Sequence, residues 1–356
     1  MRDVALLARV SNKTVSNVVN DHPHVHPATR ARVQQAIDEL GYRPNLSARG
    51  LRSGRTGVIG LAVPDLRQTY FAELADAVIA AAERRGLSVI VGQAGADRAQ
   101  EIAVLANGLR QTDGLLFSPE RLGTEDRSLL DHLRYPLVLL GERIFGGPTD
   151  HVTMHNVDGA RAAVDHLIAS GRRRVAVIGA HPDGRTGQLR PSDLRVRGYR
   201  EALAAAGLPL DRRLERAAAP WHPEDGADAT RQLLESGLDV DAIFTLNDAL
   251  GIGALRALGE AGRRVPDDVA VIGFDNITSG RFTLPSLSTV DPGRDEIAET
   301  AVAMLVERIE WGVRASTPPR LHEAAFRVVV RESTGAHGGA SAPASASTRD
   351  PAARTR

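Results

Sequence analysis

From Thr56 onward the chain alternates short apolar runs with stretches that repeat apolar residues at helical spacing. The apolar runs are residues 58–63, 87–91, 114–117, 137–140, 175–178, 242–246 and 269–274. The helical stretches lie near residues 71–85, 156–170, 192–206, 222–236, 248–261 and 292–310. This order predicts parallel strands joined by helices that cover both faces of a sheet. Because about 275 residues are too many for one sheet, we expect two α/β lobes.

Residues 1–44 have a different pattern, with three short helical signals and no strand. Ser11 is a suitable N-cap for the second helix, Pro27 suits the first turn of the third, and Gly41 ends it. Helices this short are unstable alone, so they should pack together as a tri-helical unit. The apolar faces expected to meet there are Val4, Leu7 and Ala8, then Val15, Val18 and Val19, then Val33, Ile37 and Leu40.

Polar residues mark the second of these helices. Two helices meet at a tight turn around Arg9, and the second carries polar side chains near its N-terminus, at Asn12, Lys13, Ser16 and Asn17. A helix-turn-helix uses this arrangement to bring such side chains to base edges in the major groove. An ordinary helical hairpin with solvated polar groups would have the same spacing, so the spacing alone leaves both interpretations open.

The following segment is basic. Arg43, Arg49, Arg52 and Arg55 occur with no acidic residue after Glu39. A short helix over residues 46–52 that forms only on DNA could wedge an apolar side chain into the minor groove. A flexible basic linker is the alternative.

Motifs throughout the chain resemble the lactose-repressor/galactose-repressor (LacI/GalR) family of transcription regulators. The resemblance covers about residues 2–333 and is carried, in order, by DVA…VS..TVS.VVN, V…TR.RV..AI.ELGYRPN..AR.LR.GRTG.IGL, PDL…YFAEL (64–74), DGLLF (113–117), R-x-x-GY (195–199), LND (246–248) and VIGFDN (271–276). It implies an all-α helix-turn-helix headpiece, a hinge helix, and an α/β core of two Rossmann-like lobes like the type I periplasmic sugar-binding proteins. A ligand would lie in the cleft between the lobes.

The resemblance also implies domain boundaries. The headpiece would span residues 1–44, the hinge helix and linker 45–56, and the effector-binding core 57–335. Within the core, the N-lobe would comprise about 57–157 and 291–318, and the C-lobe about 158–290 and 319–335. Residues 336–356 lack apolar periodicity, which predicts a disordered tail.

DNA-contacting residues carry over position by position. Asn12, Lys13 and Asn17 would face base edges, where Asn can pair with adenine and Lys with guanine. Thr14, Ser16 and Asn20 would contact or position phosphates. In the hinge, Leu51 would be the minor-groove wedge, with Asn45, Ala48 and Arg49 beside it. The family implies a homodimer on a pseudopalindromic double-stranded operator, with subunit contacts near residues 71–85, 248–261 and 278–285.

Effector-binding residues carry over in the same way. Arg195 lies three residues before Gly198, where the family has its effector-binding arginine. Asn247 and Asp275 match other polar contacts, at the carboxyl ends of predicted strands, where open α/β sheets bind ligands. Glu142 stands in place of the family's cleft aspartate, and the apolar wall would comprise Tyr70, Phe71, Trp221 and Phe274. Such a set suits a sugar or sugar derivative, because charged groups bind hydroxyls and aromatic rings cover C–H faces.

Each of these residues has a plainer interpretation. Phe71 and Phe274 could be core residues, and Arg195 could lie on a helix surface. The chain also departs from the family's pattern at Arg9, where glycine is common, and at His26, where a capping serine is usual. Gln68-Thr69 replaces Asn-Pro before the aromatic pair, and residues 183–191 look like a small insertion. These departures bear on the identity of the ligand more than on ligand binding.

Several function classes are disfavoured. The sequence has no cysteine, no signal peptide at its N-terminus and no apolar run long enough to cross a bilayer, so we expect a cytoplasmic protein. A periplasmic solute-binding protein would share the core but has no use for residues 1–55. A dehydrogenase or sugar-modifying enzyme would need a nucleotide fingerprint or a nucleophile–base pair, and neither is found. We therefore expect no enzyme activity and no cofactor, and a metal site at His22, His24 and His26 is a weak alternative to solvated histidines.

The net charge fits this division of the chain. The sequence has 44 basic and 44 acidic residues, so its formal net charge is zero. Taken alone, that net charge argues against a nucleic-acid partner. Residues 1–57, however, carry nine basic and four acidic residues, so the remainder holds a matching excess of acid. The sequence thus predicts a basic DNA-binding headpiece joined to a mildly acidic sensor core. The function expected is a ligand-responsive, sequence-specific transcriptional regulator, most simply a repressor of carbohydrate-utilisation genes whose operator affinity changes when the effector binds.

Overall fold

The computed structural model describes residues 1–19, 22–42, 55–95, 97–144, 146–181, 190–311 and 318–335. The chain divides into two units, Met1–Gly57 and Val58–Arg356. The predicted segments at residues 45–54, the tail at 336–356 and most of the suggested insertion lie outside the described residues.

The first unit has the three predicted helices, α1 (Arg2–Leu7), α2 (Asn12–Val19) and α3 (Pro27–Glu39). Their common core is built from buried side chains of all three helices and the first turn: Val4, Ala5, Ala8, Val15, Val18, Val33 and Ala36. The predicted packing of Leu7 and Leu40 is wrong, since these side chains are 44% and 46% exposed. Small alanines occupy the inner positions instead, which lets such short helices approach closely.

The ends of these helices follow from local chemistry. The Ser11 hydroxyl accepts a hydrogen bond from the Thr14 amide (3.1 Å), as expected for an N-cap. At α3 the His26 ring takes the role of the usual serine, its Nδ1 accepting from the Ala28 amide (3.3 Å). Arg9 adopts φ 53°, the left-handed conformation in which a side chain costs about 1 kcal/mol relative to glycine. The turn between α1 and α2 therefore keeps its shape without glycine.

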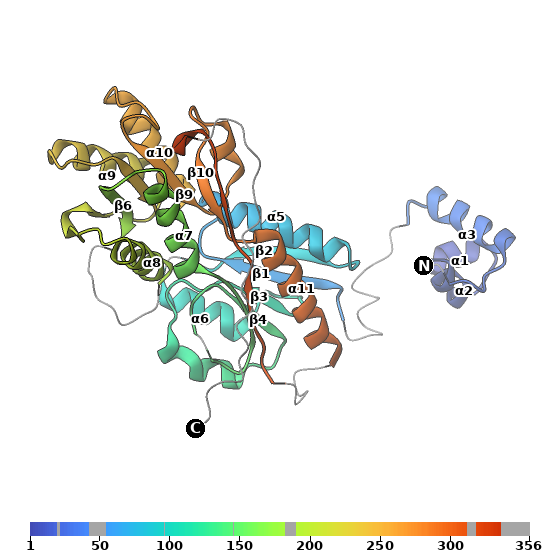
Figure 1. The fold of residues 1–356 in the computed structure, drawn as a ribbon. Coiled ribbons are helices and arrows are strands. Elements are labelled where there is room, and N and C mark those ends of the chain that lie inside the picture. The colour runs from blue at the N-terminus through green and yellow to red at the C-terminus, as the bar shows by residue number, and fades with distance from the viewer. Residues whose placement is uncertain are drawn as a thin grey trace. The chain divides into compact units, whose positions relative to one another are not determined.

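The first lobe of the core is a parallel sheet of six strands. Its order is β11-β5-β4-β3-β1-β2, and the strands are β1 (Val58–Val63), β2 (Ser88–Gln93), β3 (Leu115–Phe117), β4 (Leu137–Leu140), β5 (Asp150–Met154) and β11 (Leu321–Ala324). All its paired neighbours run parallel. The helical elements of this lobe are α5 (Thr69–Glu83), α6 (Arg98–Asn107), α11 (Arg294–Trp311) and the 3-10 segment η1 (Thr124–His132) (Figure 1).

The second lobe repeats this plan with one antiparallel edge. Its order is β12-β10-β9-β8-β6-β7, and the strands are β6 (Val175–Ala180), β7 (Glu215–Ala217), β8 (Ala242–Thr245), β9 (Ala270–Phe274), β10 (Ser288–Asp291) and β12 (Arg327–Val329). Only β12 pairs antiparallel among these strands. The helices are α7 (Asn156–Ala169), α8 (Pro191–Ala205), α9 (Pro223–Glu235) and α10 (Asp248–Glu260), with short 3-10 segments η2 (Arg212–Leu214), η3 (Thr278–Phe282) and η4 (Glu332–Thr334). Both predicted α/β lobes are thus confirmed.

The chain passes between the two sheets three times, after β5, after β10 and after β11. The expected assignment of residues 319–335 to the C-lobe is therefore wrong in part, because β11 pairs with β5 in the first sheet. The sequence did not predict β5 because it begins with the polar pair Asp150 and His151. The buried Asp150 carboxylate is paired with Arg308 of α11 (2.7 Å) and Arg320 (2.8 Å), so distant residues make this strand stable.

None of the helices in the described part of the chain is long and apolar enough to cross a membrane. Within those same ranges no three histidine, aspartate or glutamate side chains converge to hold a metal ion.

Candidate functional site

A cavity of about 260 Å³ lies between the two lobes of the core. Its walls come from the carboxyl ends of strands in both sheets and from the first turns of α5 and α8, the edge at which parallel sheets bind ligands. Seven of the eight predicted effector-binding residues line it: Tyr70, Phe71, Glu142, Arg195, Trp221, Asn247 and Asp275.

Close packing of α8 against α7 places Arg195 at this cavity. A Cβ atom at Gly198 would lie 2.2 Å from the carbonyl oxygen of Val157, so only glycine permits this approach. The next residue, Tyr199, is buried and donates from its hydroxyl to the carbonyl of Val175 (2.9 Å). The R-x-x-GY motif thus combines a side chain that faces the cavity with two residues that fix the helix behind it.

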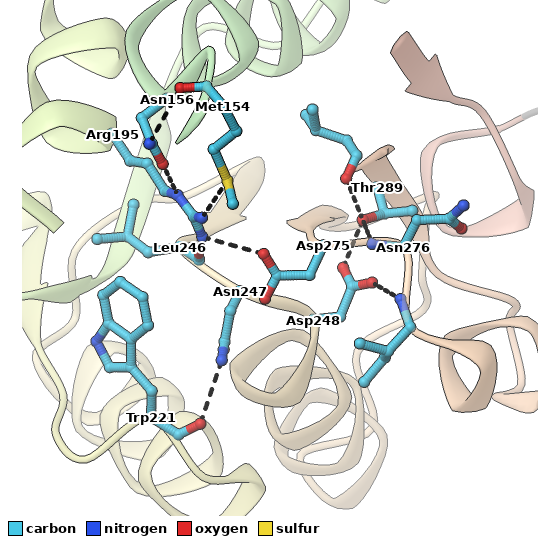
Figure 2. Close-up of polar contacts among 12 residues, drawn as sticks. Met154, Asn156, Arg195, Trp221, Leu246, Asn247, Asp248, Asp275, Asn276 and Thr289 are labelled. Atoms are coloured by element: carbon cyan, nitrogen blue, oxygen red, sulfur yellow. Dashed lines mark hydrogen bonds and ion pairs between the residues drawn. The ribbon is translucent and has the colours of Figure 1, made fainter. Parts of the chain in front are cut away.

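The Arg195 guanidinium is almost fully buried and has partners on several sides (Figure 2). Its Nε donates to Oδ1 of Asn156 (2.7 Å), and its Nη1 donates to the carbonyl of Leu246 and pairs with Oδ1 of Asp275 (3.4 Å). The alternative interpretation of Arg195 as a surface residue is wrong.

Phe274 differs from its predicted role as part of the cavity wall. It is fully buried and is not among the lining residues, because the Arg195 guanidinium covers its ring at 3.7 Å from the centroid. This stacking supports the cation from below and is worth about 2 kcal/mol when the pair is desolvated. Phe274 therefore does not line the cavity and acts on the site only by packing against the Arg195 guanidinium.

Trp221 and Asn247 hold each other in place. Asn247 is the N-cap of α10, with its Oδ1 accepting from the Leu250 amide (2.9 Å) and its Nδ2 donating to the Trp221 carbonyl (3.3 Å). The Trp221 indole N–H donates to the Gly179 carbonyl (3.0 Å). The ring of Trp221 is thereby fixed beside the cavity, 5.8 Å from the Arg195 guanidinium carbon.

Asp275 lies in a strained turn. Asp275 and Asn276 both have left-handed backbones, with φ 108° and 51°. The turn is held because the Asp275 amide donates to the Val290 carbonyl (2.8 Å) and the Asn276 amide to the Thr289 hydroxyl (3.2 Å). Burial raises the pKa of Asp275 to about 6, although the nearby cations Arg195 and Arg294 oppose the rise.

Glu142 is the corresponding acid of the first lobe, just after β4. Its Oε1 accepts from Nδ2 of Asn156 (2.5 Å) and from the Thr153 hydroxyl (3.3 Å). Burial raises the pKa of Glu142, against the effects of Arg195 and of these hydrogen bonds. Burial and the carboxylates of Asp275 and Glu142 likewise raise the pKa of the Tyr70 phenol. The cavity thus brings two desolvated carboxyl groups, one from each lobe, to a single guanidinium.

Two buried polar residues beside the cavity were not singled out from the sequence. Asn156 links Glu142 to Arg195, and no local pattern marks it. Asp248 lies under the Asp275 turn, accepting from the Thr289 hydroxyl (2.6 Å) and the Ile277 amide (2.9 Å) (Figure 2). Burial, with the charge of Asp275, holds the pKa of Asp248 well above its usual range. The sequence feature that could have pointed to Asp248 is its position in the LND motif (246–248).

Two further contacts join the lobes. The Glu73 carboxylate of α5 accepts from the Thr278 amide of the second lobe (2.8 Å), and within the first lobe it also pairs with Arg294 of α11 (2.8 Å). On another side the His222 ring lies 3.9 Å from the Asp65 carboxylate. The first of these contacts joins α5 directly to the segment that follows the Asp275 turn.

The predicted DNA-contacting residues of α2 share one face. Asn12 and Lys13 are exposed and Thr14, Ser16 and Asn17 are partly exposed, whereas Val15 and Val18 on the opposite face are buried in the headpiece core. The remaining predicted DNA contacts, Asn20, Asn45, Ala48, Arg49 and Leu51, lie outside the described residues.

Comparisons with known proteins agree with this architecture. Residues 1–45 match "Bacterial regulatory proteins, lacI family", and residues 164–334 match "Periplasmic binding protein-like domain". The chain is 36% identical to the HTH-type transcriptional regulator CelR of Thermobifida fusca over 316 residues, which are 86% of this chain and 90% of CelR.

Two solved structures extend the comparison. A CelR–cellobiose complex aligns with TM-score 0.67 and 33% identity, covering 93% of this chain and 98% of that one. A lac repressor dimer bound to operator and the anti-inducer ONPF aligns with TM-score 0.77 and 27% identity, covering 94% and 98%. The chain therefore belongs to the lacI family of bacterial regulatory proteins, which are DNA-binding transcriptional regulators and not enzymes.

Proposed function

We propose that this regulator is a repressor that acts as a homodimer on a pseudopalindromic operator in the cytoplasm, and that a small sugar or sugar derivative in the cavity between its lobes alters its operator affinity. The observation that carries the proposal is the cavity itself, where Arg195 is flanked by a carboxyl group from each lobe. A ligand that touches both lobes has different affinities for their open and closed arrangements, which is the requirement for allosteric control.

The chemistry of the lining favours a polyhydroxylated ligand. Carboxylates accept hydrogen bonds and guanidinium groups donate them, so hydroxyl groups can satisfy both. Tyr70, Phe71 and Trp221 supply the flat apolar surface that a sugar ring needs. The volume of about 260 Å³ lies just below the range of about 300–1,000 Å³ typical of drug-sized ligands, which favours a small sugar.

The exposed apolar segment after the Asp275 turn supports the predicted dimer. Phe282 is 81% exposed and Leu284 is 94% exposed, and both belong to the segment 278–285 expected at a subunit interface. Single exposed apolar side chains are common, but two large ones within three residues form the kind of apolar patch that marks an interaction surface. We expect Phe282→Ser together with Leu284→Ser to shift the protein towards monomer in sedimentation velocity runs, and an unchanged dimer fraction would contradict this interface.

Ligand binding is tested by thermal shift of the full chain against cellobiose, its component glucose and a panel of pentoses, hexoses and sugar acids. A ligand present at one hundred times its Kd adds about 2.7 kcal/mol to the free energy of unfolding. We expect Arg195→Ala to abolish the shift of any sugar that stabilises the wild type. A wild type that responds to none of the sugars, or a variant that keeps the full shift, would refute the effector assignment.

DNA binding is tested with duplexes selected from a random pool. Lys13→Ala should weaken the selected site by about 1–3 kcal/mol and relax the preference at one base pair, because Lys13 is assigned to a base edge. Equal weakening on all duplexes, with a smaller salt dependence, would instead make Lys13 a phosphate contact. Arg32→Ala on α3 provides a control that changes charge equally at an exposed position.

A further inference from the structure

Asn156 lies where the chain first crosses between the lobes. It is the first residue of α7, two residues after β5 ends, and only 2% of its surface is exposed. It is not one of the residues that line the cavity. Both ends of its amide are nevertheless used by residues that do. Nδ2 donates to Glu142 Oε1 (2.5 Å). Oδ1 accepts from Arg195 Nε (2.7 Å), a bond that Figure 2 shows.

An amide is the chemistry that this position requires. Its neighbour from the first lobe is a carboxylate, which needs a donor, and its neighbour from the second lobe is a guanidinium, which can only donate. A second carboxylate at this position would repel Glu142, and a cation would repel Arg195. The amide therefore bridges opposite charges that belong to different lobes, each of them buried.

The bridge also sets the direction of the guanidinium. With Nε held by Asn156, Nη1 of Arg195 reaches the Leu246 carbonyl and Asp275, and the plane of the group lies on the Phe274 ring. On the other side, Asn156 and Thr153 both donate to the same oxygen of Glu142, so its position is fixed relative to Arg195.

From these contacts we infer that Asn156 is a positioning residue of the ligand site, which aligns Glu142 of the first lobe with Arg195 of the second so that one ligand meets both. The role in ligand binding rests on the proposed function, whereas the three-residue link rests on the hydrogen bonds themselves. A ligand that moves either charged group would act on the crossover between the lobes through this amide.

The test exchanges the amide and the carboxylate. Asn156→Asp keeps the acceptor for Arg195 Nε but removes the donor to Glu142, together with the longer contact of the same nitrogen with the Met154 carbonyl (3.4 Å). Glu142→Gln supplies an amide opposite the new carboxylate. In the double variant the hydrogen bond forms again with donor and acceptor reversed and with the net charge of the wild type. Other charged or titratable groups that act on Glu142 or its partners are Tyr70, Asp275 and Arg143, and all remain in every variant.

Thermal unfolding without ligand gives the first readout. We expect Asn156→Asp to melt at least about 3 °C below the wild type at pH 8, because two carboxylates then face each other in a buried site. The deficit should shrink towards pH 5, where one proton can be shared between them, since a pKa raised in the folded state adds stability as pH falls. The double variant should melt within about 2 °C of the wild type at both pH values.

Gln232→Glu, an exposed amide-to-carboxylate change on α9, is the matched control and should show neither effect. Two results would show that Asn156 contributes packing alone. One is a Tm deficit for Asn156→Asp that is the same at pH 5 and pH 8. The other is a double variant whose loss of Tm equals the sum of the losses of the two single variants. Either result overturns the inference.

Sugar binding gives the second readout. For any sugar of the panel that binds the wild type, Asn156→Asp should weaken binding at least about tenfold at pH 8, which is 1.4 kcal/mol. Asn156→Asp should weaken sugar binding by a smaller factor in the Glu142→Gln background than in the wild type. Unfolding data that support the link while no sugar binds the wild type would refute the proposed effector class and leave the link intact, so the two failures are distinguishable.

Discussion

Asp275 should make the stability of this protein depend on pH in the direction opposite to that of an ordinary ion-paired acid. Its pKa is raised from 3.8 to about 6, with burial as the main cause, so the folded state binds the proton more tightly than the unfolded chain does. The stabilisation from this proton is complete below about pH 4 and is lost as pH rises through about 6. The difference between these two pKa values corresponds to about 3 kcal/mol of unfolding free energy.

Asp275→Asn should remove this dependence. The amide oxygen can still accept from Arg195, and asparagine tolerates the left-handed backbone at φ 108°, so the substitution adds little strain. The variant should therefore gain on the wild type by about 2 kcal/mol between pH 4 and pH 7, or roughly 4–8 °C in Tm. It should at the same time lose its response to sugar.

Urea unfolding at half-unit steps from pH 4 to pH 8 checks this prediction. Asp131→Asn, an exposed change on η1, serves as the control and should follow the wild type throughout. A free-energy difference between Asp275→Asn and the wild type that stays flat across this range would refute the reasoning, because it would mean that the carboxyl group is not desolvated.

Two further predictions concern the framework of the site. Gly198→Ala should lower Tm by several degrees and weaken sugar binding, because its Cβ would lie 2.2 Å from a backbone oxygen of α7. Gly259→Ala has open space around its Cβ and should be neutral or stabilising by up to about 1 kcal/mol. Equal effects of the two variants in thermal melts would contradict the packing argument. Arg308→Ala should destabilise the protein most at neutral pH. Burial alone would raise the pKa of Asp150, but its hydrogen bonds with Arg308 and Arg320 outweigh burial and lower that pKa to about 2. The resulting stabilisation is present above pH 4 and is lost as pH falls through about 2, so a Tm deficit that is the same at pH 7 and pH 2 would show that the ion pair contributes nothing.

Local patterns along the chain determined the broad architecture. Apolar runs and helical spacing located seven strands and six helices of the two lobes to within a few residues, because parallel strands buried on both faces need continuous apolar sequence. The Arg195 motif, the acids that follow strands and the aromatic pair Tyr70-Phe71 were predicted at the ligand site, because parallel sheets gather the ends of their strands at one edge.

Tertiary structure decided what depends on residues far apart in the chain. Strand β5 exists because Arg308 and Arg320, more than 150 positions away, neutralise its buried Asp150. The chain after β11 returns to the second sheet, which no composition change marks. Phe274 lies beneath the Arg195 guanidinium instead of facing the cavity, a placement fixed only when α8 packs against α7.

Asn156 shows the same division most clearly. A lone asparagine at the start of a helix reads from the sequence as an ordinary polar residue. Its partners Glu142 and Arg195 are 14 and 39 positions away in the chain and belong to different lobes. Sequence periodicity reports which face of an element is buried, but the pairing of buried charges depends on how separate elements meet. The sequence thus determined the kind of protein and the edge at which it binds its ligand, and the packing of the two lobes determined how the charges of that site are held.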